Sequence, residues 1–118
     1  MIEVEIPIKT VSEANMREHW SVKHKRVKAQ HEAVKWMLGL ELIKQDLLGK
    51  LKLPLKIGFT RIAPRKLDKD DNLNISFKAI RDQVAKTIGF NDGDDRVTWD
   101  YQQEKGKEYA VKIRIEQL

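Results

Sequence analysis

Apolar and polar residues alternate along four segments of the chain, and a period of two is typical of strands that bury one face. The segments are residues 2–8, 51–61, 97–101 and 109–115. Pro54 indicates either that the second strand lies at a sheet edge or that the proline lies at the start of the strand. Lys105 and Gly106 predict a hairpin turn between the last two strands.

Two other segments repeat apolar residues every three or four positions, which predicts amphipathic helices. The first is expected to start at Ser21 as N-cap and to end at Gly49. Its predicted buried stripe is Val22, Ala29, Ala33, Trp36, Met37, Leu40, Ile43 and Leu47. The second is capped by Asn72, ends at Gly89, and has the stripe Leu73, Phe77, Ile80, Val84 and Ile88.

The resulting order, β-α-β-α-β-β, predicts the α+β class. We expect a two-layer sandwich in which two helices cover one face of a four-stranded sheet. The length suits a single domain over residues 1–118. The uncovered sheet face, or an unprotected edge, favours a homodimer.

Composition narrows the classes of function. The formal net charge of +5 favours an anionic partner, nucleic acid above all. The absence of cysteine excludes disulfides, zinc ribbons and thiol nucleophiles. The acidic start lacks the pattern of a signal peptide, and no apolar run could span a bilayer. We therefore expect a soluble, cytoplasmic protein with no membrane partner and, lacking a phosphate-cradling Gly-rich loop, no small-molecule cofactor.

Basic side chains cluster in two parts of the sequence and predict contacts with DNA phosphates. The candidates are Arg17, Lys23, Lys25, Arg26, Arg61, Arg65, Lys66 and Lys78. A charge run on a helix is also compatible with a solvated surface, so that interpretation stays open.

Two Asp-rich loops, residues 67–72 and 91–95, flank the second helix. Carboxylates held close together repel each other unless a cation lies between them, and Mg²⁺ prefers such hard oxygen ligands. The candidate ligands are Asp68, Asp70, Asp71, Asp92 and Asp94, with Mn²⁺ a substitute for Mg²⁺. Asp also caps helices and builds turns, which is the alternative. An EF-hand is excluded because Leu73 and Ala79 stand where it needs Gly and Glu.

Residues 61–103, RIAPRKLDKDDNLNISFKAIRDQVAKTIGFNDGDDRVTWDYQQ, resemble the core of the RusA family of Holliday-junction resolvases, and its phage and prophage members most closely. The opening IPIKTVSEAN resembles the first strand and turn of that family. The resemblance implies an α+β homodimer that cuts four-way DNA junctions with Mg²⁺ held by Asp. Carried over to this chain, the implied catalytic residues are Asp68, Asp70, Asp71, Asp94 and Lys78.

The chain departs from the family pattern Asp-x-Asp-Asn by one residue. If Asp71 and Asn72 are the anchor, Lys69 stands where the first Asp is expected. If Asp70 is the anchor, Asp68 is its partner and Asp71 replaces Asn. Two alternatives to the resolvase follow: a DNA-binding homodimer without nuclease activity, and a structural dimer whose acids only cap helices.

Overall fold

The computed structural model describes residues 1–10, 20–67 and 73–118, and its elements follow the predicted order. The elements are β1 (Ile2–Ile6), α1 (Trp20–Lys44), β2 (Leu55–Ala63), α2 (Asn74–Ser76), α3 (Lys78–Ile88), β3 (Val97–Lys105) and β4 (Ala110–Gln117). The α+β class is confirmed. β2 begins directly after Pro54, so this proline marks a strand start, and the strand itself is central in the sheet.

The four strands form one mixed sheet in the order β1-β4-β2-β3. β1 and β2 pair antiparallel with β4, whereas β2 and β3 run parallel. The predicted hairpin between the last two strands is wrong, because β2 lies between them. Gly106 makes the crossing possible: its N–H donates to the Ala63 carbonyl at 3.1 Å, and a Cβ there would lie 2.5 Å from Ile62 Cγ2.

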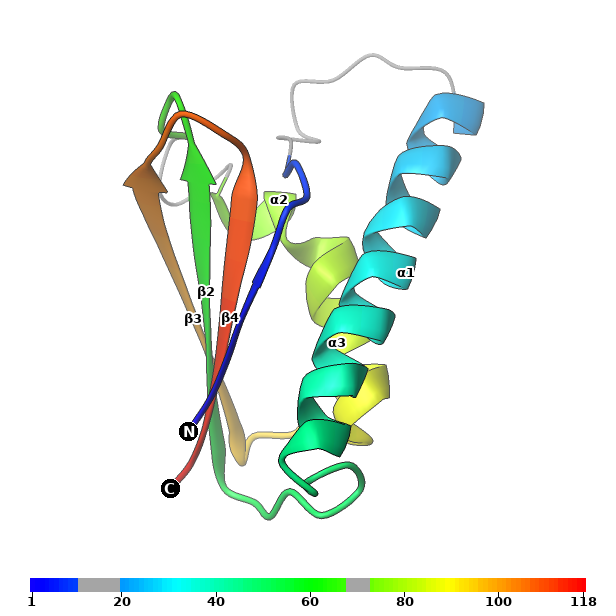
Figure 1. Cartoon of the computed structure of the whole chain (residues 1–118), viewed down its shortest axis with the longest axis vertical. Coiled ribbons are helices and arrows are strands. Elements are labelled where there is room, and N and C mark those ends of the chain that lie inside the picture. Colours follow the sequence, from blue (N-terminus) through cyan, green and yellow to red (C-terminus); the bar gives the residue numbers. More distant parts are fainter. Residues whose placement is uncertain (11–19, 68–72) are drawn as a thin grey trace.

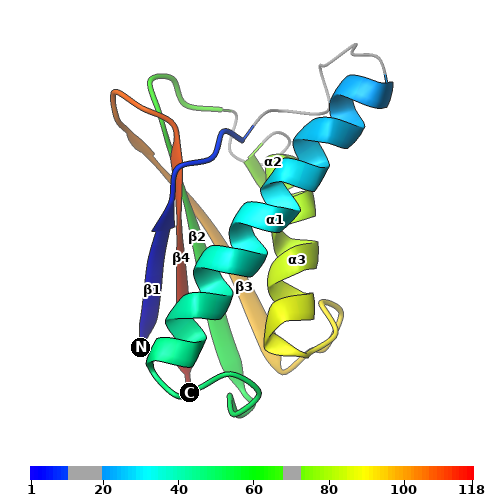
Figure 2. The same ribbon diagram turned by 45° about the vertical axis from the view of Figure 1, so that its right-hand side comes forward.

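Both long helices, α1 and α3, lie on the same side of the sheet, as expected (Figures 1 and 2). The predicted stripe of the second helix is confirmed, since all five of its residues are at most 5% exposed. The helix is interrupted at Phe77, whose ring stacks on Phe59 of β2 at a centroid distance of 5.1 Å. Gly89 ends α3 in the left-handed conformation at φ 85°, which favours glycine.

The predicted stripe of α1 is wrong. The helix buries Gln30, Val34, Leu38 and Leu42. The Gln30 side chain is satisfied there, because its Nε2 donates to the Lys9 carbonyl at 2.9 Å. The opposite stripe stays in solvent, with Trp36 63% and Leu40 and Ile43 each 59% exposed. The boundaries also differ, since α1 already includes Ser21 and ends at Lys44, before Gly49.

The uncovered face of the sheet is polar. One cross-strand row there contains Glu3, Arg114, Gly58 and Asp100. A Cβ on Gly58 would lie 3.4 Å from an Arg114 guanidinium nitrogen, so the glycine leaves room for that side chain. This face therefore lacks the apolar surface expected of a dimer interface. Among the described residues, no helix is long and apolar enough to cross a membrane.

Candidate functional site

Asp68, Asp70, Asp71 and Arg17 lie outside the described residues, but both ends of the first acidic loop are fixed. On one side, the Gln103 side chain of β3 clamps Leu67. Its Oε1 accepts from the Leu67 N–H at 2.9 Å, and its Nε2 donates to the Leu67 carbonyl at 2.8 Å. On the other side, Leu73 is 1% exposed in the core.

A pocket of about 420 Å³ lies beside both ends of this loop. Its lining includes Lys66, Leu73, Asp100 and Gln103. Asp100 was not among the candidates from sequence, yet it is the only carboxylate in the described lining of this pocket. Among the described residues, its Oδ2 accepts one hydrogen bond, from the Gln102 amide at 3.4 Å, which leaves most of its acceptor capacity unused.

The second acidic loop is held by its own hydrogen bonds. Asp94 accepts from the Arg96 backbone N–H at 2.9 Å and from the Arg96 guanidinium at 3.1 and 2.9 Å. These hydrogen bonds hold the pKa of the Asp94 carboxyl below its usual value. Asn91 Oδ1 accepts from the Gly93 N–H at 2.8 Å. These contacts are those of a turn, and the three bonds to Asp94 use most of the roughly four acceptor positions of its carboxylate.

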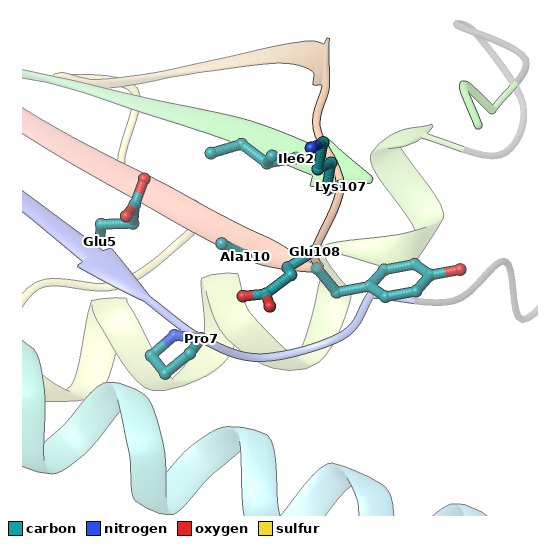
Figure 3. A pocket seen from close by; sticks show the side chains of 7 residues that line it. Glu5, Pro7, Ile62, Lys107, Glu108 and Ala110 are labelled. Atoms are coloured by element: carbon teal, nitrogen blue, oxygen red, sulfur yellow. The ribbon is translucent and has the colours of Figure 1, made fainter. Parts of the chain in front are cut away.

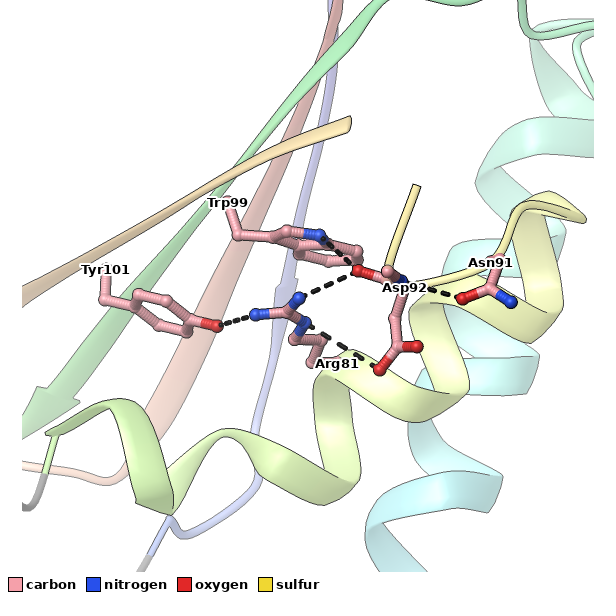
Figure 4. A network of polar contacts seen from close by, with 6 residues as sticks. Arg81, Asn91, Asp92, Trp99 and Tyr101 are labelled. Atoms are coloured by element: carbon pink, nitrogen blue, oxygen red, sulfur yellow. Dashed lines mark hydrogen bonds and ion pairs between the residues drawn. The ribbon is translucent and has the colours of Figure 1, made fainter. Parts of the chain in front are cut away.

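Asp92 is fixed by a network that the sequence did not predict (Figure 4). Arg81 donates to the Asp92 carbonyl at 2.8 Å and to the Tyr101 hydroxyl at 2.9 Å. Its guanidinium also lies 4.5 Å from the Trp99 ring centroid, and Trp99 Nε1 donates to the same Asp92 carbonyl at 3.2 Å. The only available signal was a basic residue beside the apolar stripe of α3.

The second acidic loop leads into the start of β3, whereas Leu67, before the first acidic loop, lies toward the other end of this strand. Figure 1 shows β3 running along one edge of the sheet. Asp92 and Asp94 precede Val97, where the strand begins, whereas Leu67 is clamped at Gln103. Six residues of strand separate these two points, a span of about 20 Å. The structure therefore does not bring Asp92 or Asp94 to the ends of the first loop. No three His, Asp or Glu side chains of residues 1–10, 20–67 and 73–118 gather as metal ligands.

The predicted DNA-binding residues divide into several groups. Arg61 is 5% exposed, and it donates to Thr10 Oγ1 at 2.9 Å and to the Arg65 carbonyl at 2.7 Å. Burial lowers the pKa of its guanidinium, and these contacts indicate a structural role. Lys25, Arg65 and Lys66 are exposed or half-exposed, and Lys66 lines the pocket of Asp100. Arg26 is half-buried on α1.

Lys23 and Lys78 are brought together. They line a groove of about 180 Å³ between α1 and α3, together with His31 and Asp82. Lys78, the implied catalytic lysine, therefore faces α1, while Lys66 and Asp100 line a different pocket at the β3 edge.

The largest of these pockets, about 560 Å³, lies near β1, the end of β2 and the chain between β3 and β4. Its lining includes Glu5, Lys107 and Glu108 (Figure 3). In Figure 3 the side chains of Glu5, Lys107 and Glu108 do not converge on one point. It contains none of the predicted site residues. Searches with the chain against protein-family models and curated proteins gave no match.

Proposed function

We propose that this protein is a metal-dependent endonuclease that cuts branched, four-way DNA junctions. The observation that supports the proposal is the pocket beside Leu67 and Leu73, because Asp100 and Lys66 line it and the sequence between Leu67 and Leu73 contains Asp68, Asp70 and Asp71. Asp100 fits as a further metal ligand, whereas Asp94 is occupied by Arg96 and does not.

The residues of this pocket have distinct roles in the proposed reaction. A bound Mg²⁺ would supply charge neutralisation and an activated water for phosphodiester hydrolysis. Lys66 binds a DNA phosphate at the entrance of the pocket. Gln103 is a positioning residue, since its two hydrogen bonds fix Leu67 directly before Asp68. Burial of Leu73 fixes the other end of the same segment.

The test is incubation of the protein with a synthetic four-way junction, with and without Mg²⁺. We expect paired cuts only with the metal, and no cuts in a linear duplex of the same sequence. Asp70→Asn keeps the size of the side chain but weakens a metal ligand, so it should abolish cutting and preserve binding. If the unaltered protein binds the junction but never cuts it with Mg²⁺ or Mn²⁺, the DNA-binding homodimer without nuclease activity is the correct alternative.

The proposed enzyme is a homodimer that pairs through the outer face of α1. This face exposes Val22, Trp36, Met37, Leu40 and Ile43, and with typical side-chain areas they leave on the order of 500 Å² of apolar surface uncovered per protomer. A stable dimer buries roughly 800 Å² on each partner, so this stripe with a polar rim is sufficient. A two-fold protein also suits the two equivalent cut sites of a junction.

Gly39 is an independent indication of the same interface. A glycine inside a helix costs about 1 kcal/mol relative to alanine. Nothing lies within 4 Å of a Cβ built on Gly39, so packing within the chain gives no reason for it. It lies beside Trp36, Leu40 and Ile43 on the helix, where it would let a second helix approach closely.

Sedimentation velocity at micromolar concentration tests the interface. We expect a dimer for the unaltered protein and a monomer for Leu40→Glu. Gly39→Leu should also be monomeric while keeping its fold, because the space around Gly39 is open within one chain. The matched control is Lys56→Glu on the outer face of the sheet, which should remain dimeric. If Lys56→Glu is monomeric and Leu40→Glu remains dimeric, the dimer interface is on the outer face of the sheet and not on α1.

A further inference from the structure

We propose that the groove between α1 and α3 is a second, metal-free phosphate site that takes one backbone phosphodiester of the DNA. The observation is that Lys23 of α1 and Lys78 of α3, distant in sequence, line one groove of about 180 Å³. This volume is smaller than the usual range for drug-sized ligands, and it suits a group of the size of phosphate. The identity of the ligand as DNA rests on the proposed function.

The charge of the groove matches a phosphodiester. Lys23 and Lys78 contribute two positive charges and Asp82 one negative charge, so the lining carries a net +1 with His31 neutral. A phosphodiester carries a single negative charge. Lysine binds phosphate as a point charge with three rotatable donors, so two lysines on facing helices can approach one phosphate from both sides.

His31 adds a donor that the protein itself does not use. Its Nε2 is buried and has no hydrogen-bond partner among the described residues. An unsatisfied buried polar atom is unfavourable, so a ligand that supplies a partner gains from it.

The groove is separate from the pocket of the proposed nuclease. It lies between the two helices, whereas Lys66 and Asp100 lie at the edge of β3. A DNA phosphate bound in this groove would position the DNA, and it would belong to a part of the DNA strand that is not cut. Affinity for DNA should therefore depend on the groove, while the chemical step depends on the acids.

The experiment follows the imidazole NMR signals of the full-length protein at neutral pH as inorganic phosphate is added. We expect the His31 signal to shift and saturate, while the signal of His24, exposed on the same helix, stays unchanged. Lys23→Ala and Lys78→Ala should each weaken phosphate binding by at least about fivefold, the loss of one charge-assisted contact. The matched control Lys35→Ala, exposed on α1 and outside the groove lining, should bind phosphate normally. The melting temperature of each variant reports whether it is folded.

A second titration adds a four-way junction to the phosphate-loaded protein. Displacement of phosphate from His31 supports DNA as the ligand, and phosphate binding that DNA does not displace overturns that assignment. Equal, unsaturable shifts of His24 and His31 overturn the site itself. If His31 responds as expected but the junction is never cut, the groove stands and the proposed nuclease fails. If junctions are cut and His31 does not respond, the groove fails alone.

Discussion

The acidic residues of the loop before β3 and the one in the middle of β3 lie in very different settings. At the start of the strand, Asp94 accepts three hydrogen bonds from Arg96, and Arg81 holds the carbonyl of Asp92. In the middle of the strand, Asp100 lines a pocket with Lys66 and accepts one hydrogen bond, from the Gln102 amide at 3.4 Å. The number of acids in a segment therefore says little about metal binding. What matters is whether a neighbouring cation has already taken their lone pairs.

The sharpest way to break this comparison is to remove one carboxylate from each of the two settings. Asp100→Asn should lower the rate of junction cutting by about 100-fold, because it weakens a metal ligand, and 100-fold corresponds to about 2.7 kcal/mol of activation free energy. Asp94→Asn should leave the rate within about twofold, since that carboxylate serves its own turn. Single-turnover cleavage at saturating Mg²⁺ measures both.

Junction affinity, measured in Ca²⁺ by gel shift, should be unchanged in both variants. Rescue of Asp100→Asn by a softer metal such as Mn²⁺ would strengthen its assignment as a ligand. The opposite pattern, with Asp94→Asn inactive and Asp100→Asn active, would place the metal at the start of β3 and overturn the comparison.

Arg81 should matter for stability rather than for cleavage. Its guanidinium joins α3, the loop of Asp92 and β3 through two hydrogen bonds and a contact with the Trp99 ring. Arg81→Leu should lower the free energy of unfolding by about 2 kcal/mol, because it also leaves the Tyr101 hydroxyl without this donor. Urea unfolding at a fixed protomer concentration measures the loss.

Lys86→Leu is the matched control, since Lys86 lies on the last turn of the same helix and contributes to none of these contacts. We expect its free energy of unfolding to stay within about 0.5 kcal/mol of the unaltered protein. A loss in Arg81→Leu no larger than that of Lys86→Leu would show that the network does not hold the loop.

The fold was predictable from sequence where one segment carries one apolar stripe. The segment of α3 does so, and its stripe was predicted in full. α1 carries two apolar stripes on opposite sides, Val34-Leu38-Leu42 and Trp36-Leu40-Ile43. Periodicity alone cannot say which of the two stripes faces the core. The stripe predicted to be buried is mainly the one that faces solvent. The hairpin predicted between the last two strands was wrong, because the turn signal at Gly106 does not show that β2 pairs with both of them and lies between them.

The candidate site was predictable in part for a similar reason. The Asp-rich loops are visible in the sequence, but their separation depends on the parallel pairing of β2 and β3. In the sequence, Asp100 is one polar position in an alternating strand, and only the pocket that it shares with Lys66 and Leu73 associates it with the described ends of the first acidic loop. Lys23 and Lys78 were predicted separately as phosphate ligands, and the packing of α1 against α3 brings them into one groove.

The smallest expected effect concerns acid stability at the start of β3. Hydrogen bonds from Arg96 lower the pKa of Asp94 from its ordinary value of 3.8, so the carboxylate stabilises the fold when the pH is above that value. The contribution is lost as the pH falls through the lowered pKa of the folded protein. Asp94→Asn should therefore be slightly less stable than the unaltered protein at neutral pH, and the difference should shrink below about pH 4. Because Arg96 is 64% exposed and solvent screens the pair, the difference should also shrink at high salt. Thermal melts between pH 2 and pH 7 measure it. A difference in melting temperature that grows toward low pH would contradict the assignment of Asp94 to the turn.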